Sequence, residues 1–239
     1  MRAEQVLSIL AVPGRFQDER VWGGLLPRLR SRYRVVPTDA YGLANHRADV
    51  ILACADAASA AVHATREGRG RAVVLLAPLV NLAIFELPEV LVDAGRWMWT
   101  TEMAEMMDMA EEVRASEDPE QRRAALADGF VRLIGREIPA ADADRLRAMV
   151  RDSADVIEHP GPIPPIYTAP FVEELRALEL PLLVLAAAGD ERAATIARAL
   201  AERAPRSELV LLETAQPHYP WLAQPAAAAE AVLQFLGRI

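Results

Sequence analysis

The sequence contains no lysine, so arginine supplies every basic side chain. Without a lysine amine, the usual route to a Schiff-base intermediate is closed. The single cysteine, Cys54, excludes an internal disulfide and any metal site built from several cysteines. We expect the protein to work with neither a metal nor a cofactor.

Basic charge is also in deficit, because 26 basic residues face 34 acidic ones and the formal net charge is -8. An acidic surface repels phosphate backbones, and no basic patch with interleaved aromatic residues occurs, so we expect no nucleic-acid partner. No apolar run reaches the roughly 18 residues that a membrane span needs. The first residues do not follow a secretory leader pattern. These features predict a cytoplasmic protein without a membrane partner, and a homodimer stays open.

The residues that are present favour an α/β fold, since 52% are hydrophobic and short apolar runs alternate with helical patterns. The runs expected to form strands are 6–12, 33–38, 48–54, 72–77, 182–186 and 208–212. The patterns expected to form helices are 22–30, 57–67, 97–115, 119–135, 141–157, 168–178, 191–204 and 225–237. We expect one domain over residues 1–239, in which an all-helical insertion covers about 95–178.

Four segments carry a resemblance to a known family. They read LAVPGRFQDERVWGGLLPRL, YRVVPTDAYG, LPLLVLAAAGDE and LVLLETAQPHYPWLAQP. Together they resemble the α/β-hydrolase superfamily, with its strand and loop before a tryptophan-bearing helix, its Asp-x-x-Gly strand end, and the loops of its catalytic acid and histidine. The resemblance implies a mostly parallel sheet with helices on both faces and a helical cap. Pro13 stands where the family usually has histidine.

The two C-terminal segments imply a catalytic pair. The resemblance puts Asp190 at the acid position and His218 at the base position. A carboxylate bonded to one imidazole nitrogen fixes the tautomer and leaves the other nitrogen free to accept a proton. A histidine in a surface loop without a role is the plain alternative for His218.

The family's nucleophile motif, Gly-x-Ser-x-Gly, does not occur in the sequence. The segment VILACADAASAAV resembles the strand, elbow and helix around it, with Ala55 at the nucleophile position. A register shifted by one would make Asp56 the nucleophile, as in epoxide hydrolases and haloalkane dehalogenases, but the tryptophan that normally follows is absent. Ser59 has small neighbours at the right spacing, and Cys54 is more typical of a buried core thiol.

A second placement of the elbow stays open, because the link after Asp39 is short for a crossover helix between parallel strands. If residues 48–67 formed that helix, the elbow would fall at residues 77–81. Neither placement puts a serine at the nucleophile position.

A site without serine still has parts for proton transfer. The backbone N–H groups of Arg15 and Asp56 are expected to form an oxyanion hole, as the resemblance implies. A base facing such a hole suits elimination, ring closure, isomerisation or decarboxylation, and it can also activate water. We expect a lyase, cyclase or isomerase. The alternatives are a hydrolase using Asp56, Ser59 or activated water, and a non-catalytic protein that binds a ligand or partner.

Apolar residues at helical spacings in the insertion indicate the substrate class. They are Trp97, Trp99, Met103, Met106 and Met107. Such a stripe forms an adaptable wall for an apolar small molecule, or it packs the insertion onto the core.

Overall fold

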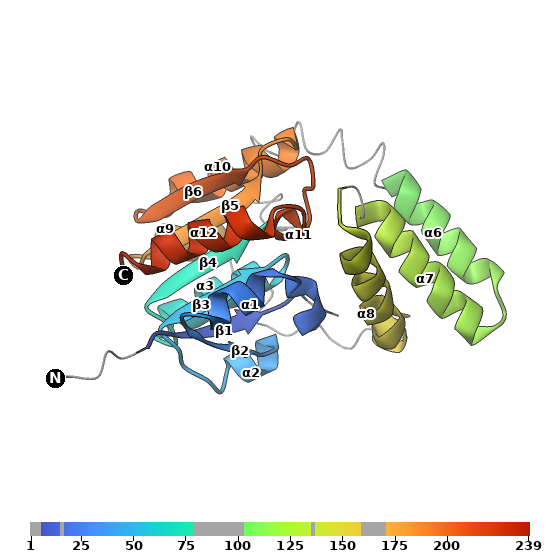
Figure 1. Cartoon of the computed structure of the whole chain (residues 1–239), viewed down its shortest axis with the longest axis horizontal. Coiled ribbons are helices and arrows are strands. Elements are labelled where there is room, and N and C mark those ends of the chain that lie inside the picture. The colour runs from blue at the N-terminus through green and yellow to red at the C-terminus, as the bar shows by residue number, and fades with distance from the viewer. Residues whose placement is uncertain (1–5, 15–16, 79–102, 135–136, 159–170) are drawn as a thin grey trace.

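A parallel six-stranded sheet forms the centre of the structure (Figure 1). The computed structural model describes residues 6–14, 17–78, 103–134, 137–158 and 171–239. The strand order is β2-β1-β3-β4-β5-β6, and every neighbouring pair is parallel, which confirms the predicted sheet. The strands are β1 (Ser8–Val12), β2 (Arg34–Pro37), β3 (Val50–Cys54), β4 (Ala72–Leu76), β5 (Leu182–Ala187) and β6 (Ser207–Leu212).

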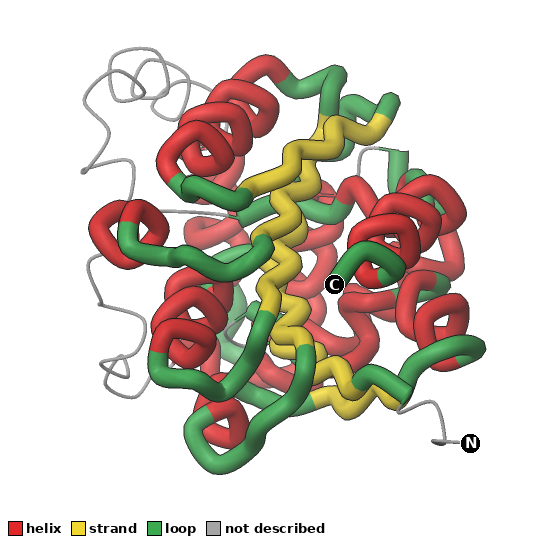
Figure 2. Tube along the Cα trace, turned by 90° about the vertical axis from the view of Figure 1, so that its left-hand side faces the viewer, coloured by secondary structure: helices red, strands yellow, loops and turns green. Residues whose placement is uncertain are grey.

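Helices cover both faces of the sheet, as Figure 2 shows with the strands between two layers of helix. Helices α1 (Leu25–Arg30) and α12 (Pro225–Leu236) pack on one face together with Val50, Leu52 and Cys54. On the other face, α3 (Ala57–Arg66), α9 (Phe171–Arg176) and α10 (Glu191–Arg203) pack together with Ile51 and Ala53. Because successive strand side chains point to opposite faces, the fully buried β3 contributes to both cores.

The expected helix over residues 22–30 is wrong at its start. A 3-10 helix, η1 (Glu19–Trp22), comes first, and α1 begins only at Leu25. Between them Gly23 adopts φ 50, a left-handed conformation that glycine reaches without steric cost and that ends a helix. The one-turn helices α2 (Ala40–Leu43) and α11 (Pro220–Ala223) were not expected, because four residues are too few for a periodic pattern.

The chain passes from β2 to β3 by way of α2, and β1 lies between these two strands. The alternative in which residues 48–67 form a single helix is therefore wrong. Residues Val50–Cys54 are all buried and pair with β1 and β4. A short run of branched and apolar residues buried on both faces is typical of a central parallel strand.

Three helices between β4 and β5 stand beside the sheet in Figure 1: α6 (Met103–Ala115), α7 (Pro119–Ile134) and α8 (Ala140–Glu158). We call them the helical insertion. Its α7 and α8 bury Ala127, Leu146 and Met149 against the same core as Trp22 and Trp221. The expected limits of the insertion, about 95 and 178, stay a prediction, since residues 79–102 and 159–170 lie outside the described part. No helix among the described residues is long and apolar enough to cross a membrane.

Candidate functional site

A strained turn follows the central strand β3. Ala55 has φ 52, which non-glycine residues rarely adopt, and α3 begins two residues later at Ala57. The Ala55 N–H donates to the carbonyl of Leu76 at 3.2 Å, so the turn is tied to β4. Ala55 is buried, with 4% of its surface exposed. This strand, left-handed residue and helix have the form of a nucleophile elbow centred on Ala55.

The neighbouring candidates have ordinary backbone geometry. Asp56 has φ -74 and ψ -13, in the right-handed helical region, and its carboxylate makes no capping bond to α3. Ser59 lies inside α3, and its hydroxyl donates to the carbonyl of Asp56 at 3.4 Å. The turn thus favours Ala55 over both as the elbow residue. A nucleophilic role for Asp56 or Ser59 stays a prediction.

Asp56 directs its carboxylate towards the end of β1. A Cβ placed on Gly14 would lie 2.8 Å from Oδ1 of Asp56 and 2.9 Å from Oε1 of Gln17. The loop after β1 and the turn after β3 therefore meet at this point, with two side-chain oxygens close to Gly14. The resemblance assigns the oxyanion hole to this same place. Asp56 belongs to it, whereas Arg15 lies outside the described residues.

Gln17 links the elbow to the segment of His218. Its Oε1 accepts hydrogen bonds from the Gly14 N–H at 3.1 Å and from the Cys54 thiol at 3.7 Å. Its Nε2 donates to the Tyr219 hydroxyl at 2.8 Å. Tyr219 directly follows His218 in the chain, so these bonds bring that segment to the ends of β1 and β3. Gln17 carries no local signal that sequence reasoning could have used, because its partner is 202 residues away.

Burial favours the protonated forms of the Cys54 thiol and the Tyr219 hydroxyl. It raises the pKa of the Cys54 thiol, and the Asp56 charge raises it further, against the opposing hydrogen bond from the Gly14 backbone. Burial likewise raises the pKa of Tyr219 well above its usual value, with smaller contributions from Cys54 and Asp56. Cys54 is thus a protonated thiol rather than a nucleophile, which agrees with the expected core role.

The loops of Asp190 and His218 lie side by side. The Gly189 N–H donates to the carbonyl of Thr214 at 2.9 Å, and a Cβ on Gly189 would lie 3.0 Å from that oxygen. Asp190 caps α10, where its Oδ1 accepts the N–H of Ala193 at 2.7 Å. A carboxylate has a second oxygen that is able to accept from an imidazole. The hydrogen bond between Asp190 and His218 stays a prediction.

The expected apolar wall is described only in part. Trp97 and Trp99 lie outside the described residues, and so do the side chains of Met103 and Met106 in the first turn of α6. Met107 is 64% exposed. The role of these residues in a substrate pocket therefore stays a prediction.

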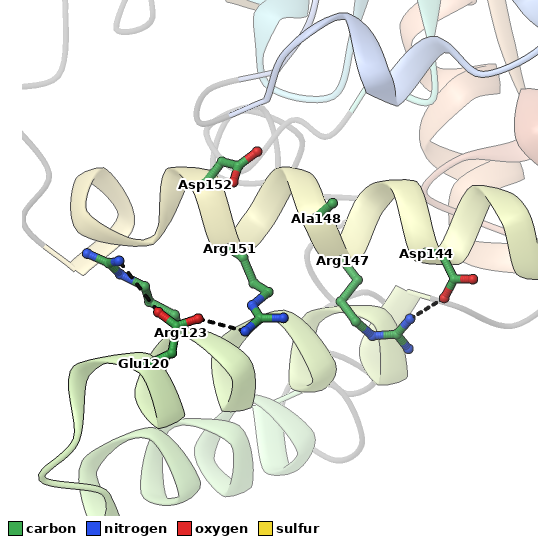
Figure 3. A pocket seen from close by; sticks show the side chains of 7 residues that line it. All are labelled: Glu120, Arg123, Asp144, Arg147, Ala148, Arg151 and Asp152. Carbon is green, nitrogen blue, oxygen red and sulfur yellow. Dashed lines mark hydrogen bonds and ion pairs between the residues drawn. The ribbon is translucent and has the colours of Figure 1, made fainter.

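A groove of about 490 Å³ lies elsewhere, between α7 and α8 (Figure 3). Its lining residues are Glu120, Arg123, Asp144, Arg147, Ala148, Arg151 and Asp152. Ion pairs run across it and along its wall, with Arg151 2.7 Å from Glu120 and Arg147 2.6 Å from Asp144. The Arg151–Glu120 pair joins the two helices, and exposed pairs of this kind each contribute little to stability.

Within the described ranges, no group of three or more His, Cys, Asp or Glu side chains is arranged to hold a metal ion. The groups at the carboxyl edge of the sheet are instead a histidine, an aspartate, backbone N–H groups and buried neutral donors. They are suited to moving protons and to binding a polar atom of a small molecule.

Comparison with known proteins adds evidence on the fold. No family model and no curated protein matches the chain. Among solved structures, it is similar to a hydrolase from Oleispira antarctica, with 13% identity and a TM-score of 0.64 over 99% of this chain and 93% of that one. The esterase RhEst1 from Rhodococcus has 17% identity and a TM-score of 0.62, over 97% and 90%.

MenH from S. aureus is also similar, with 14% identity and a TM-score of 0.57 over 99% of this chain and 96% of that one. Identities this low bear on the fold alone. The similarity extends over nearly the whole length of each chain, and the sheet has the parallel order expected. The chain therefore has the α/β-hydrolase fold.

Proposed function

We propose that this protein is an enzyme that acts on an apolar small molecule, with His218 as general base and Asp190 as its partner. The reaction proceeds without a serine nucleophile and is of the lyase, cyclase or isomerase type. The observation that carries the proposal is the left-handed turn at Ala55, which has the form of an elbow but bears only a methyl group. Without a nucleophile at the elbow no acyl-enzyme forms, whereas a base beside it can still remove a proton from a substrate.

The contacts around the elbow support this assignment. Gln17 connects the elbow strand to Tyr219, next to His218, and Gly189 packs the Asp190 loop against the His218 loop. The N–H of Asp56 follows the elbow residue and is the described half of the proposed oxyanion hole; Arg15 is the other half. An enolate or alkoxide formed by proton removal would be stabilised there.

One experiment tests whether His218 and Asp190 form a base aimed at the elbow. The Ala55→Ser variant adds a single hydroxyl at the elbow, and a fluorophosphonate probe then reports whether this serine is activated. We expect no labelling of the wild-type protein and stoichiometric labelling of the variant, mapped to position 55. The double variants that add His218→Ala or Asp190→Asn are the controls, and both should lose the labelling.

A folded Ala55→Ser variant that stays unlabelled would show that no base reaches the elbow, and the proposed mechanism would then be wrong. Labelling of the wild-type protein at Ser59 would show a serine nucleophile. Once a substrate is known, His218→Ala should lower the rate by about 10²–10⁴-fold, the usual contribution of a general base, with the thermal midpoint unchanged.

A second candidate function rests on the Asp56 carboxylate. This group lies against Gly14 at the same edge of the sheet. It is placed to activate a water, which would make the protein a hydrolase without a covalent intermediate. In that case Asp56→Asn would abolish turnover, while His218→Ala would retain most of it.

A further inference from the structure

Gln216 is a fully buried polar residue two positions before His218, with 0% of its surface exposed. Its Oε1 accepts the backbone N–H of His218 at 3.0 Å and that of Tyr219 at 3.3 Å. Its Nε2 donates to the carbonyl of Ile134 at 2.5 Å. The orientation of the amide follows from its partners, because a backbone N–H can only donate and a carbonyl can only accept.

Ile134 is the last residue of α7, so Gln216 connects the helical insertion directly to the backbone of His218. Because this connection is buried, breaking its hydrogen bonds costs more free energy than it would at the surface. An amide hydrogen bond contributes about 0.5–1.5 kcal/mol net, but a buried polar group left without its partner loses its full desolvation energy. Removing the Gln216 amide would leave a carbonyl on α7 and two N–H groups at His218 and Tyr219 without their partner.

A second connection runs from the link between α7 and α8. The Glu137 carboxylate accepts the Thr214 hydroxyl at 2.6 Å and the Ala215 N–H at 2.9 Å. These hydrogen bonds hold the pKa of Glu137 below its usual range, with burial opposing them slightly. The Thr214 hydroxyl in turn accepts the N–H of Gln216 at 3.1 Å. Residues 214–216 are thus attached to the insertion at both ends.

Glu137 adopts φ 64, a left-handed conformation that costs a non-glycine residue on the order of 1–3 kcal/mol. Such a conformation persists where surrounding contacts hold it, and here those contacts are the bonds to Thr214 and Ala215. The insertion itself is packed firmly, since Ala127 of α7 and Met149 of α8 are both completely buried. The Gln216 connection is buried, whereas the Glu137 connection lies at the surface, where Glu137 and Ala215 are exposed.

We propose that Gln216 is a positioning residue that couples the helical insertion to His218, so that the placement of α7 sets the placement of the proposed base. This inference rests on the proposed function of His218. A ligand that shifts α7 would change the Ile134–Gln216 bond and would thereby move the backbone N–H of His218. Substrate binding against the insertion and proton transfer at His218 then become linked events.

The test replaces Gln216 in two ways and measures backbone hydrogen exchange of the whole protein. Gln216→Met keeps the size of the side chain and removes all three hydrogen bonds. Gln216→Glu keeps an acceptor for His218 and Tyr219, but its ionised form has no hydrogen for Ile134. Gln234→Glu is the matched control, because Gln234 is an exposed glutamine whose amide donates to Glu230 of the same helix, α12.

We expect Gln216→Met to speed exchange by at least about tenfold both in residues 126–134 of α7 and in residues 213–219. The loss of one net hydrogen bond produces about that change, and α7 loses one bond while the loop loses two. Gln216→Glu should depend on pH. Near neutrality both segments should exchange faster. On acidification the buried carboxyl protonates, its O–H again donates to Ile134, and protection should return.

The titration is made between neutrality and the ordinary glutamate pKa of about 4.3. Glu137 is the acidic group that faces the same loop, and its hydrogen bonds to Thr214 and Ala215 hold its pKa below the usual range. His218 is a second titratable residue beside position 216, since its N–H donates to that side chain. The Gln216→Glu protein with His218→Ala therefore checks that the recovery belongs to position 216.

Faster exchange in residues 213–219 with unchanged exchange in α7 would show that Gln216 stabilises only its own loop, and the coupling would be refuted. Unchanged exchange in both segments would also refute it. Exchange does not depend on activity, so it separates this inference from the proposed function. In an Ala55→Ser background, Gln216→Met should in addition slow fluorophosphonate labelling about tenfold while Gln234→Glu leaves it unchanged. Failure of labelling with intact exchange coupling would contradict the proposed function alone.

Discussion

The backbone strain at Ala55 can be measured by replacing this residue with glycine. Alanine with φ 52 has its Cβ close to the following carbonyl, which costs roughly 1–2 kcal/mol, whereas glycine has no such cost. Two effects oppose this gain. The buried methyl group is lost, at about 0.8 kcal/mol, and the unfolded chain gains freedom worth about 0.4–1 kcal/mol. These effects nearly cancel, so Ala55→Gly should leave the free energy of unfolding almost unchanged.

Ala60 is the matched control for this substitution. It is also completely buried, but it lies inside α3 with ordinary helical geometry. Ala60→Gly loses a methyl group and about 1 kcal/mol of helix propensity, with no strain to release. We therefore expect it to destabilise the protein by about 2 kcal/mol more than Ala55→Gly does, or roughly 4–8 °C in thermal midpoint for a chain of this size.

Urea unfolding followed by far-UV circular dichroism measures both variants, and the slope against urea shows whether the transition itself has changed. Equal destabilisation by the two substitutions would refute the strain at Ala55 and, with it, the elbow assignment. Ala55→Val extends the series, because a branched side chain tolerates this conformation even less than alanine does. It should be the least stable of the three.

Two further predictions concern the edges of the site and of the sheet. Gly189→Ala places a Cβ 3.0–3.1 Å from backbone atoms of the facing loop and should destabilise the protein by about 1–3 kcal/mol. Gly237→Ala meets only ordinary contacts and should leave the stability unchanged. Thermal unfolding of both variants measures the difference. Burial acts to raise the pKa of Asp49, but hydrogen bonds from Ser8 and the charge of Arg71 outweigh it and lower the pKa. A lowered pKa gives stability that is complete above the ordinary value of about 3.9 and is lost as the pH falls through the folded-state value. Unfolding midpoints between neutrality and about pH 2 should therefore fall less steeply for Asp49→Asn than for the wild-type protein, and parallel curves would contradict this cause.

The strands of the sheet could be predicted because each one is encoded by a few consecutive residues. Each strand is a short apolar run, and residues such as Val50–Cys54 carry enough hydrophobicity to be read without knowledge of their neighbours. The doubt about the second elbow came from the length of the link after β2. One turn of helix was sufficient there, and no composition rule would have indicated it.

The contacts around the site could not be predicted, because they join residues far apart in the chain. Gln17 and Tyr219 are separated by 202 positions, and Gln216 and Ile134 by 82. A glutamine within a loop reads as a solvent-exposed residue, since glutamine is seldom fully buried without partners. The only signal at Gln216 was its position two residues before a histidine that the resemblance had already indicated.

Residues with a strained backbone occur in several parts of the site. The non-glycine residues with positive φ among those described are Ala55, Ala77 and Glu137. Ala55 and Ala77 directly follow the neighbouring strands β3 and β4, and Glu137 bonds to the loop before His218. Local preferences that are broken without benefit would be removed by selection for stability, so strain of this kind gathers where function needs a fixed geometry. An alanine held in a left-handed turn at the elbow is difficult to explain by packing alone. It is explained if the turn presents the Asp56 N–H to a substrate and needs no nucleophile in front of it.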